Sequence, residues 1–290
     1  MSSLNRTDKN VKELIMAAEQ LMAGKKGLIM GLANDHSIAW GIAQALNAHG
    51  AQIAISYQNE ALEKRVKPLA EQLDNSLLIK CDVSDSASVE ACFNELGKKW
   101  GKIDFLVHAI AFSDKDQLRG RTIDTTLDNF LNTMHISCYS FLEACRCASP
   151  IMNEGGSIVT LTYLGSERVL PNYNIMGVAK AALEASVRYA AVDMGKQKVR
   201  VNAISSGPIK TLAASGIGDF RTILRWNELN APLQRNVMQT EVGNTALSLL
   251  SDLGSAVTGE VLHVDCGYNT IAMLNIDNAK ESAEVLKEFD

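Results

Sequence analysis

Short, mostly apolar runs recur along the chain and alternate with longer segments that mix apolar and charged positions. The runs are typical of strands that helices bury on both faces, and they occupy residues 27–31, 51–57, 77–80, 103–108, 157–161, 199–204 and 261–264. The mixed segments have helical spacing and occupy residues 38–47, 60–73, 86–99, 125–149 and 173–194. This alternation predicts a doubly wound, seven-stranded parallel sheet, the Rossmann fold, which binds ligands at the carboxyl ends of its strands.

The same pattern predicts one domain with a short extension at each end. We expect the domain to cover residues 25–274, between an N-terminal extension of residues 1–24 and an acidic tail of residues 275–290. Residues 11–21 have apolar positions at helical spacing, which indicates a short amphipathic helix before the domain.

Composition narrows the possible functions. The chain has 290 residues, of which 47% are hydrophobic, enough for a substantial core. The net charge of −5 argues against nucleic acid as a partner, because phosphate binding needs a basic face. No segment has the run of about 18 uncharged apolar residues that a membrane span needs. The six cysteines lack the spacing of a metal site and the density of a disulfide scaffold, so we expect reduced thiols, no metal and a cytoplasmic protein.

A turn that could cradle phosphate follows the first predicted strand. It runs from Gly31 to Gly41 without the G-x-G-x-x-G fingerprint, so an ordinary strand–turn–helix connection explains it equally well. As a phosphate site, Gly31 would allow a tight turn, Ser37 would cap the helix that faces a pyrophosphate, and Gly41 would let that helix lie close to the sheet.

Residues after the second and third strands bear on the choice of nucleotide. Gln58 stands where an acidic residue usually binds ribose hydroxyls and a basic residue accommodates a 2′-phosphate. Because a neutral amide can hydrogen-bond a hydroxyl but carries no charge for phosphate, we expect NADH rather than NADPH. Lys64 and Arg65 weaken that preference unless they only form a solvated helix face. Asp82 could accept from an adenine amino group or cap the next helix.

The strongest chemical signal is two tyrosines and a lysine near the fifth strand. Tyr173 and Lys180 are seven positions apart, and seven helical residues turn through roughly 700° and rise about 10.5 Å, which puts both on one face. The phenol could then lie at a reacting carbon and the ammonium at the ribose of a cofactor. Tyr163, ten residues before Tyr173, either acts on the substrate or merely closes its strand.

Together these motifs resemble the bacterial NADH-dependent enoyl-acyl-carrier-protein reductases, a divergent family of short-chain dehydrogenases/reductases, over about residues 27–272. The resemblance rests on the loop at 31–39, on segments 56–59, 81–83, 163–168 and 171–181, and on segments 200–205, 207–216 and 259–265.

The resemblance implies a reaction and a set of site residues. The reaction is the NADH-dependent reduction of the trans-2 double bond of enoyl-acyl-carrier-protein thioesters, the last step of fatty-acid elongation, in a homotetramer. Tyr173 would stabilise the enolate, Tyr163 would orient substrate or help to protonate the α-carbon, and Ser113 would contact substrate. The cofactor-binding residues would be Gly31, Ser37, Ile38, Gln58, Asp82, Val83, Ile110, Lys180, Ile209, Lys210, Thr211, Leu212 and Ala213.

The resemblance also implies a lid over about residues 211–230, whose helix would dock the acyl carrier protein. Arg221 and Arg225 keep basic character there, whereas Gly218 and Thr222 stand where basic residues are common. Ala111 stands where many relatives have glycine, which would narrow the pocket slightly.

Two other functions compete with this interpretation. A carbonyl reductase of the same fold needs a hydroxyl thirteen residues before its tyrosine and a lysine four after it; Thr160 meets the first need, but Gly177 fails the second. A non-catalytic nicotinamide-binding protein would not need Tyr163, Tyr173 and Lys180 together.

Overall fold

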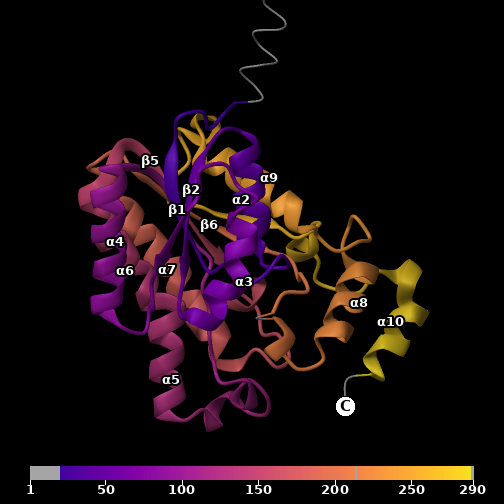
Figure 1. Cartoon of the computed structure of the whole chain (residues 1–290). Helices are drawn as coiled ribbons and strands as arrows, with labels where there is room; N and C mark the ends of the chain where they lie inside the picture. Colours follow the sequence, from indigo (N-terminus) through magenta and orange to yellow (C-terminus); the bar gives the residue numbers. More distant parts are fainter. Residues whose placement is uncertain (1–19, 213, 289–290) are drawn as a thin grey trace, which may run out of the picture.

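The computed structural model describes residues 20–212 and 214–288. A seven-stranded, fully parallel sheet runs through it in the order β3-β2-β1-β4-β5-β6-β7, with helices on both faces (Figure 1). The strands are β1 (Lys26–Met30), β2 (Gln52–Tyr57), β3 (Leu77–Lys80), β4 (Ile103–His108), β5 (Met152–Thr162), β6 (Arg200–Ser206) and β7 (Val261–Val264). The predicted Rossmann-type sheet is therefore confirmed. Most of the predicted helix at residues 11–21 lies outside the described part.

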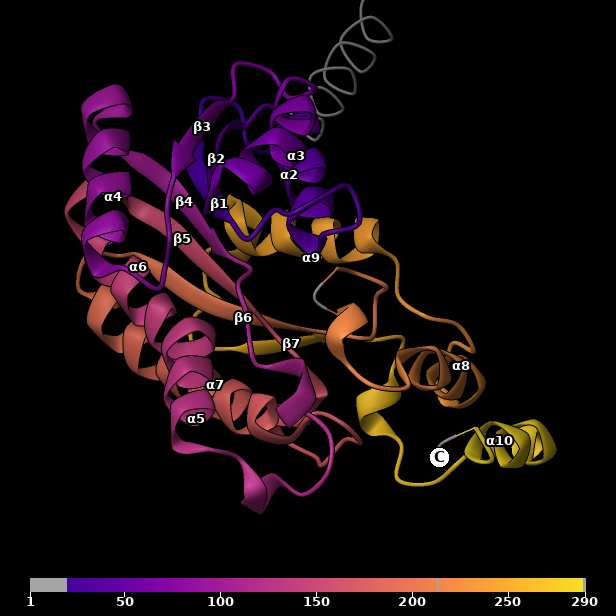
Figure 2. The same ribbon diagram turned by 60° about the horizontal axis from the view of Figure 1, so that its bottom comes forward.

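Two layers of helices enclose the sheet. One layer consists of α2 (Ile38–Ala48), α3 (Glu60–Ala70) and α9 (Gln239–Leu250). The other consists of α4 (Ser86–Trp100), α5 (Leu127–Met134), α6 (Ser140–Ala148) and α7 (Asn174–Gly195), with a π-helical turn at His135–Tyr139 between α5 and α6. Two further helices, α8 (Phe220–Asn230) and α10 (Ala279–Leu286), lie beside each other outside both layers (Figure 2).

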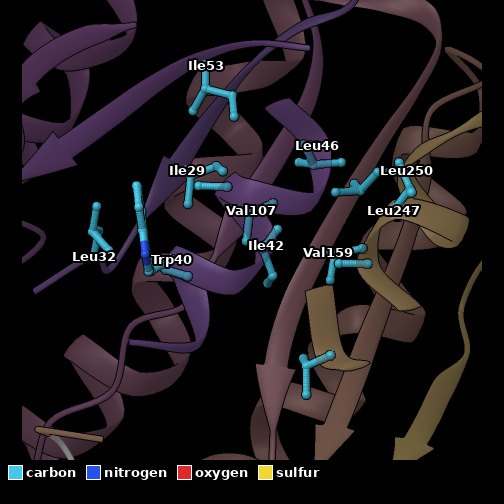
Figure 3. Packing of buried hydrophobic residues seen from close by; sticks show 14 of the residues in the cluster. Ile29, Leu32, Trp40, Ile42, Leu46, Ile53, Val107, Val159, Leu247 and Leu250 are labelled. Carbon is cyan, nitrogen blue, oxygen red and sulfur yellow. The ribbon is translucent and has the colours of Figure 1, made fainter. Parts of the chain in front are cut away.

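Alternate residues of each central strand supply two separate cores. In β1, Ile29 packs toward α2 and α9, whereas Leu28 and Met30 pack toward the layer that contains α4 and α7. A strand that is buried on both faces in this way reads as a continuous apolar run, which is why the sequence revealed it. Figure 3 shows the first of these cores, with Ile29, Leu32, Trp40, Ile42, Leu46, Ile53, Val107, Val159, Leu247 and Leu250.

Glycines bring α2 and α9 into close contact. A Cβ atom on Gly243 would lie 2.4 Å from the carbonyl oxygen of Gly41, and one on Gly41 would lie 2.6 Å from the backbone oxygen of Gln239. Gly41 therefore allows α2 to approach α9, and the prediction that it brings the helix close to the sheet was wrong.

We expect Gly243→Ala to destabilise the fold by about 1–3 kcal/mol, because the new methyl group collides with backbone atoms. Alanine stabilises a helix interior by about 1 kcal/mol relative to glycine. A net loss of folding stability in Gly243→Ala would therefore be due to the collision. Gly195→Ala is the matched control, since a Cβ there meets nothing within 4 Å. Denaturant unfolding measures both variants, and equal or higher stability of Gly243→Ala would contradict the expectation.

The segment assigned to an acidic tail carries ordered helices that pack on α8. A 3-10 turn at Ile276–Asn278 leads into α10, in which Val285 is fully buried. Asn230 at the end of α8 accepts a hydrogen bond from the backbone of Asn275 at 2.8 Å. Arg225 of α8 forms an ion pair with Glu288 at 3.1 Å. The C-terminal segment is thus joined to the predicted lid.

Candidate active site

A cavity of about 1290 Å³ opens at the carboxyl ends of β1, β4, β5 and β6. This is the position that a doubly wound sheet provides for a ligand. Of the predicted site residues, those that line the cavity are Gly31, Ser37, Ile38, Ile110, Ser113, Tyr163, Tyr173, Lys180, Ile209, Thr211 and Leu212. Gln58, Asp82, Val83 and Lys210 are not among the lining residues, and Ala213 lies outside the described residues.

The turn after β1 requires glycine and leaves a helix end open. Gly31 has a φ of +96°, and a Cβ there would lie 2.1 Å from the carbonyl oxygen of Ala109. Ser37 stands at the N-cap of α2, but its hydroxyl accepts from the backbone N–H groups of Ala33 and Asn34, each at 3.1 Å. The prediction that Ser37 caps the helix was therefore wrong. The first N–H groups of α2 stay available at the positive end of the helix dipole, which favours an anion.

Gln58 and Asp82 meet at the ends of β2 and β3, beside the cavity. The amide Nε2 of Gln58 donates to Oδ1 of Asp82 at 3.2 Å, and the hydroxyl of Ser84 donates to the same oxygen at 2.7 Å. Burial alone would raise the pKa of the Asp82 carboxyl, but the hydrogen bonds from Ser84 and Gln58 outweigh it and lower that pKa. Asp85, rather than Asp82 or Ser84, caps α4.

The two tyrosines form one wall of the cavity. Tyr163 follows the last residue of β5, and Tyr173 stands at the N-cap of α7, just before the helix rather than within it. Their ring centroids lie 5.3 Å apart, with the edge of one ring toward the face of the other at 79°. A Cβ on Gly165 would lie 2.3 Å from the Tyr173 ring, so this glycine makes room for it. Burial raises the pKa of both phenols, which keeps them protonated as donors.

Lys180 lies on α7, two helical turns after Tyr173. Its side chain is buried, and its Nζ donates to the carbonyl oxygen of Leu161 on β5 at 2.7 Å. Burial lowers the pKa of the ammonium to about 8. This hydrogen bond holds the ammonium of Lys180 at the cavity wall and uses one of its N–H donors. The remaining N–H donors can bind a ligand.

A family model described as enoyl-(acyl carrier protein) reductase matches residues 31–269. The chain belongs to this family. It is 64% identical to the NADH-dependent enoyl-acyl-carrier-protein reductase 1 of Rhizobium meliloti strain 1021 over 260 residues, which are 90% of this chain and 96% of the relative. It is 57% identical to the corresponding NADH-dependent reductase of Rickettsia typhi strain Wilmington, across 87% of this chain and 97% of the relative.

Solved structures of the family agree with the fold. The enzyme of Anaplasma phagocytophilum in complex with NAD superimposes with a TM-score of 0.85 at 56% identity, over 89% of this chain and 96% of that one. The Bacillus cereus enzyme with NADP⁺ and indole naphthyridinone gives a TM-score of 0.86 at 50% identity, over 88% of this chain and 100% of that one. The family model itself ends before α10.

Two polar residues of the site were missed by sequence reasoning. Thr162 lines the cavity between Leu161 and Tyr163, and its hydroxyl donates to the buried carboxylate of Glu184 on α7 at 2.6 Å. The one available signal was that Glu184 follows Lys180 by four positions, a spacing that helical packing makes common.

Other predicted residues take different places. Ser113 lines the cavity, and its hydroxyl accepts from Thr133 at 2.9 Å. Arg221 is exposed on α8, whereas Thr222 beside it is buried. Within residues 20–212 and 214–288, no cluster of three His, Cys, Asp or Glu residues could hold a metal, and no helix has the length and apolarity to cross a membrane.

Proposed function

We propose that this protein reduces the trans-2 double bond of enoyl-acyl-carrier-protein thioesters with NADH, the last step of the fatty-acid elongation cycle. The observation that carries the proposal is the wall formed by Tyr163, Tyr173 and Lys180, which faces one cavity in a member of the enoyl-(acyl carrier protein) reductase family.

The residues at the carboxyl edge of the sheet fit a dinucleotide. Gly31, where a side chain would collide with the backbone of Ala109, permits the tight turn that leads from β1 to α2, and the open N-terminus of α2 can face a pyrophosphate. Gln58, held by Asp82, offers a neutral amide to ribose hydroxyls. No basic side chain stands at that position, so the proposal includes a preference for NADH over NADPH.

The reaction then follows from the donors on the wall. NADH, when bound, supplies a hydride to the β-carbon of the enoyl thioester, and negative charge develops on the thioester oxygen. Tyr173 donates a hydrogen bond to that oxygen, and the raised pKa of its buried phenol keeps the proton in place for this task. Lys180 holds the ribose hydroxyls through its ammonium. Tyr163, packed edge to face against Tyr173, orients the thioester or aids protonation of the α-carbon.

An apolar wall continues from the tyrosines toward the predicted lid. Leu118 and Met176 pack with Tyr173 in one cluster, and Ile217 packs against it. All of them line the cavity, together with Phe220 at the start of α8. These side chains would bind the acyl chain, so residues 211–230 would close over a hydrocarbon and exclude water from the reacting groups.

The geometry disfavours the carbonyl reductase alternative. Thr160, the hydroxyl that this chemistry would need, is fully buried and is not a lining residue of the cavity. Its hydroxyl donates to the carbonyl oxygen of His108 at 3.0 Å and contacts the His108 ring at 3.1 Å. It is therefore engaged inside the sheet, away from any carbonyl substrate.

The acyl carrier protein would dock at α8, as the resemblance implies. Arg221 is exposed and can pair with an acidic partner, whereas Arg225 is already engaged by Glu288. Gly218 and Thr222 contribute no charge. Docking therefore rests on fewer basic residues than in the family pattern, and Arg221 is its main cation.

Self-association into a homotetramer is supported by an apolar face on the layer of α5 and α7. Leu127, Leu131 and Tyr139 are exposed around α5, and Tyr189 and Val192 are exposed on α7, which packs beside it. A face of this kind favours burial against a second copy. All six cysteines are free thiols, which supports a place in the reducing cytoplasm.

The test is oxidation of NADH with crotonyl or dodecenoyl thioesters, beside a 3-oxoacyl thioester and beside NADPH. We expect turnover with the enoyl substrates and NADH. Turnover with only the oxo substrate would assign a carbonyl reductase, and NADH binding without any turnover would assign a non-catalytic binding protein.

A further inference from the structure

Two polar bridges join the end of β5 to α7 at the level of the reacting groups. In the first, Lys180 donates to the carbonyl oxygen of Leu161. In the second, Thr162 donates to Oε1 of Glu184 at 2.6 Å. Because Leu161 and Thr162 directly precede Tyr163, both bridges act on the segment that carries this tyrosine.

Glu184 is a buried carboxylate, and among residues 20–212 and 214–288 no guanidinium forms an ion pair with it. A buried carboxylate is unfavourable unless hydrogen bonds or opposite charge compensate it. Glu143, which is also buried, has Arg146 at 3.4 Å for this purpose. Within the described residues, the hydrogen-bond partner of Glu184 is the neutral hydroxyl of Thr162. Its charge therefore acts on the groups around it, of which Lys180 lies one helical turn away.

The other titratable groups that face Lys180 are neutral. His108 of β4 is fully buried, and burial followed by the charge of Lys180 lowers its pKa to about 3. Cys138 of the π-helical turn has a thiol whose pKa burial raises, so it stays protonated. Burial likewise raises the pKa of the Tyr173 phenol, with smaller contributions from Tyr163 and Glu184. Glu184 is thus the anionic group in this set.

We propose that Glu184 is a positioning residue of the active site: its carboxylate holds Thr162 at the end of β5 and balances the charge of Lys180, so that the lysine stays an ammonium where it meets the cofactor. The proposal deepens the proposed function and rests on it for the role of Lys180. Burial lowers the pKa of Lys180, and the interactions with the Cys138 thiol and the Glu184 carboxylate oppose that effect. Without the carboxylate, the ammonium would lose its proton at a lower pH.

The test is the pH dependence of the Kd for NADH in the full chain, measured by fluorescence titration without any thioester. In Glu184→Gln the amide oxygen still accepts from Thr162, but the charge is gone. We expect similar Kd values for wild type and variant at pH 6 and a Kd that is about threefold or more weaker in the variant at pH 8. Superimposable pH profiles would overturn the charge-balancing role.

Two further variants separate this role from mere packing. Glu143→Gln makes the same change at a buried glutamate on α6, so its pH profile should match that of wild type. Thr162→Val keeps the charge and deletes the bridge; its pH profile should be unchanged while kcat with crotonyl thioester falls, and Thr162→Ser should restore kcat. A Thr162→Val enzyme with wild-type kcat would overturn the positioning role. Since the titration needs no turnover, an enzyme that binds NADH but reduces no enoyl thioester would refute the proposed function separately.

Discussion

Tyr173→Phe is expected to lower kcat for enoyl thioester reduction by about 100- to 1000-fold, the usual loss when one preorganised donor to a developing oxyanion is removed. The phenol lies in the cavity wall, and burial holds its pKa above the ordinary value, so it serves as a hydrogen-bond donor throughout the neutral range. The ring of phenylalanine keeps the edge-to-face packing with Tyr163. The Kd for NADH should therefore stay within about twofold of wild type. Steady-state kinetics and NADH titration measure the two effects.

Tyr163→Phe is the matched control, because it deletes the other phenol of the same pair. We expect a smaller loss of kcat than in Tyr173→Phe, since the oxyanion donor is retained. A larger loss in Tyr163→Phe would transfer the donor role to Tyr163. Near-wild-type kcat in Tyr173→Phe would refute the mechanism proposed above.

Lys180→Met is expected to weaken NADH binding by about 10- to 150-fold, which corresponds to the loss of a charge-assisted hydrogen bond. Methionine fills a similar volume but cannot donate to the ribose or to the carbonyl oxygen of Leu161. The measurement is the Kd for NADH at pH 7. A Kd within threefold of wild type would refute the assigned role of Lys180.

The same variant should keep a stability close to that of wild type. The pKa of Lys180 in the folded protein, about 8, lies below its ordinary value of 10.5 because burial disfavours the charge. Between these two pH values the unfolded chain binds more protons, so stability rises with pH there and is lowest below pH 8, where the buried ammonium is fully charged. Replacing it by a neutral side chain removes that cost at pH 7 but leaves Glu184 without the opposite charge, so the two effects oppose each other and Tm should stay within a few degrees of wild type. A Tm well below that of wild type would show that Lys180 supports the fold.

The sequence predicted the sheet well because its strands are buried on both faces. Leu28, Ile29 and Met30 pack into two different cores, so every position of β1 had to be apolar. β5 begins at Met152, earlier than the predicted strand. The sequence did not reveal these first residues, because they are partly exposed and include Asn153 and Glu154, which interrupt the apolar run. α9 was not predicted, because Gly243 within it lowers the helix propensity of the segment. The reason for a glycine at this position is the close contact with α2, which the sequence does not show.

For the site, the sequence determined which chemical groups are present, and the tertiary structure decided how they meet. The spacing of Tyr173 and Lys180 made these two residues candidates, and the family resemblance added Tyr163 to them. Local spacing could not show that the rings of Tyr163 and Tyr173 touch, because their contact joins the end of β5 to the start of α7.

Contacts between distant segments also decided which polar groups surround the candidate catalytic residues. Ser37 turns back into its own loop, and the carboxylate of Glu184 reaches Thr162 across the boundary between sheet and helix. The sequence predicted an acidic tail for residues 275–288, because the few apolar side chains there form no long periodic pattern. In the structure Val285 is nevertheless buried, on the helix α10 that packs against α8. Periodicity along the chain determines which face of an element is buried, whereas the partner of each polar group depends on packing between elements that are far apart in sequence.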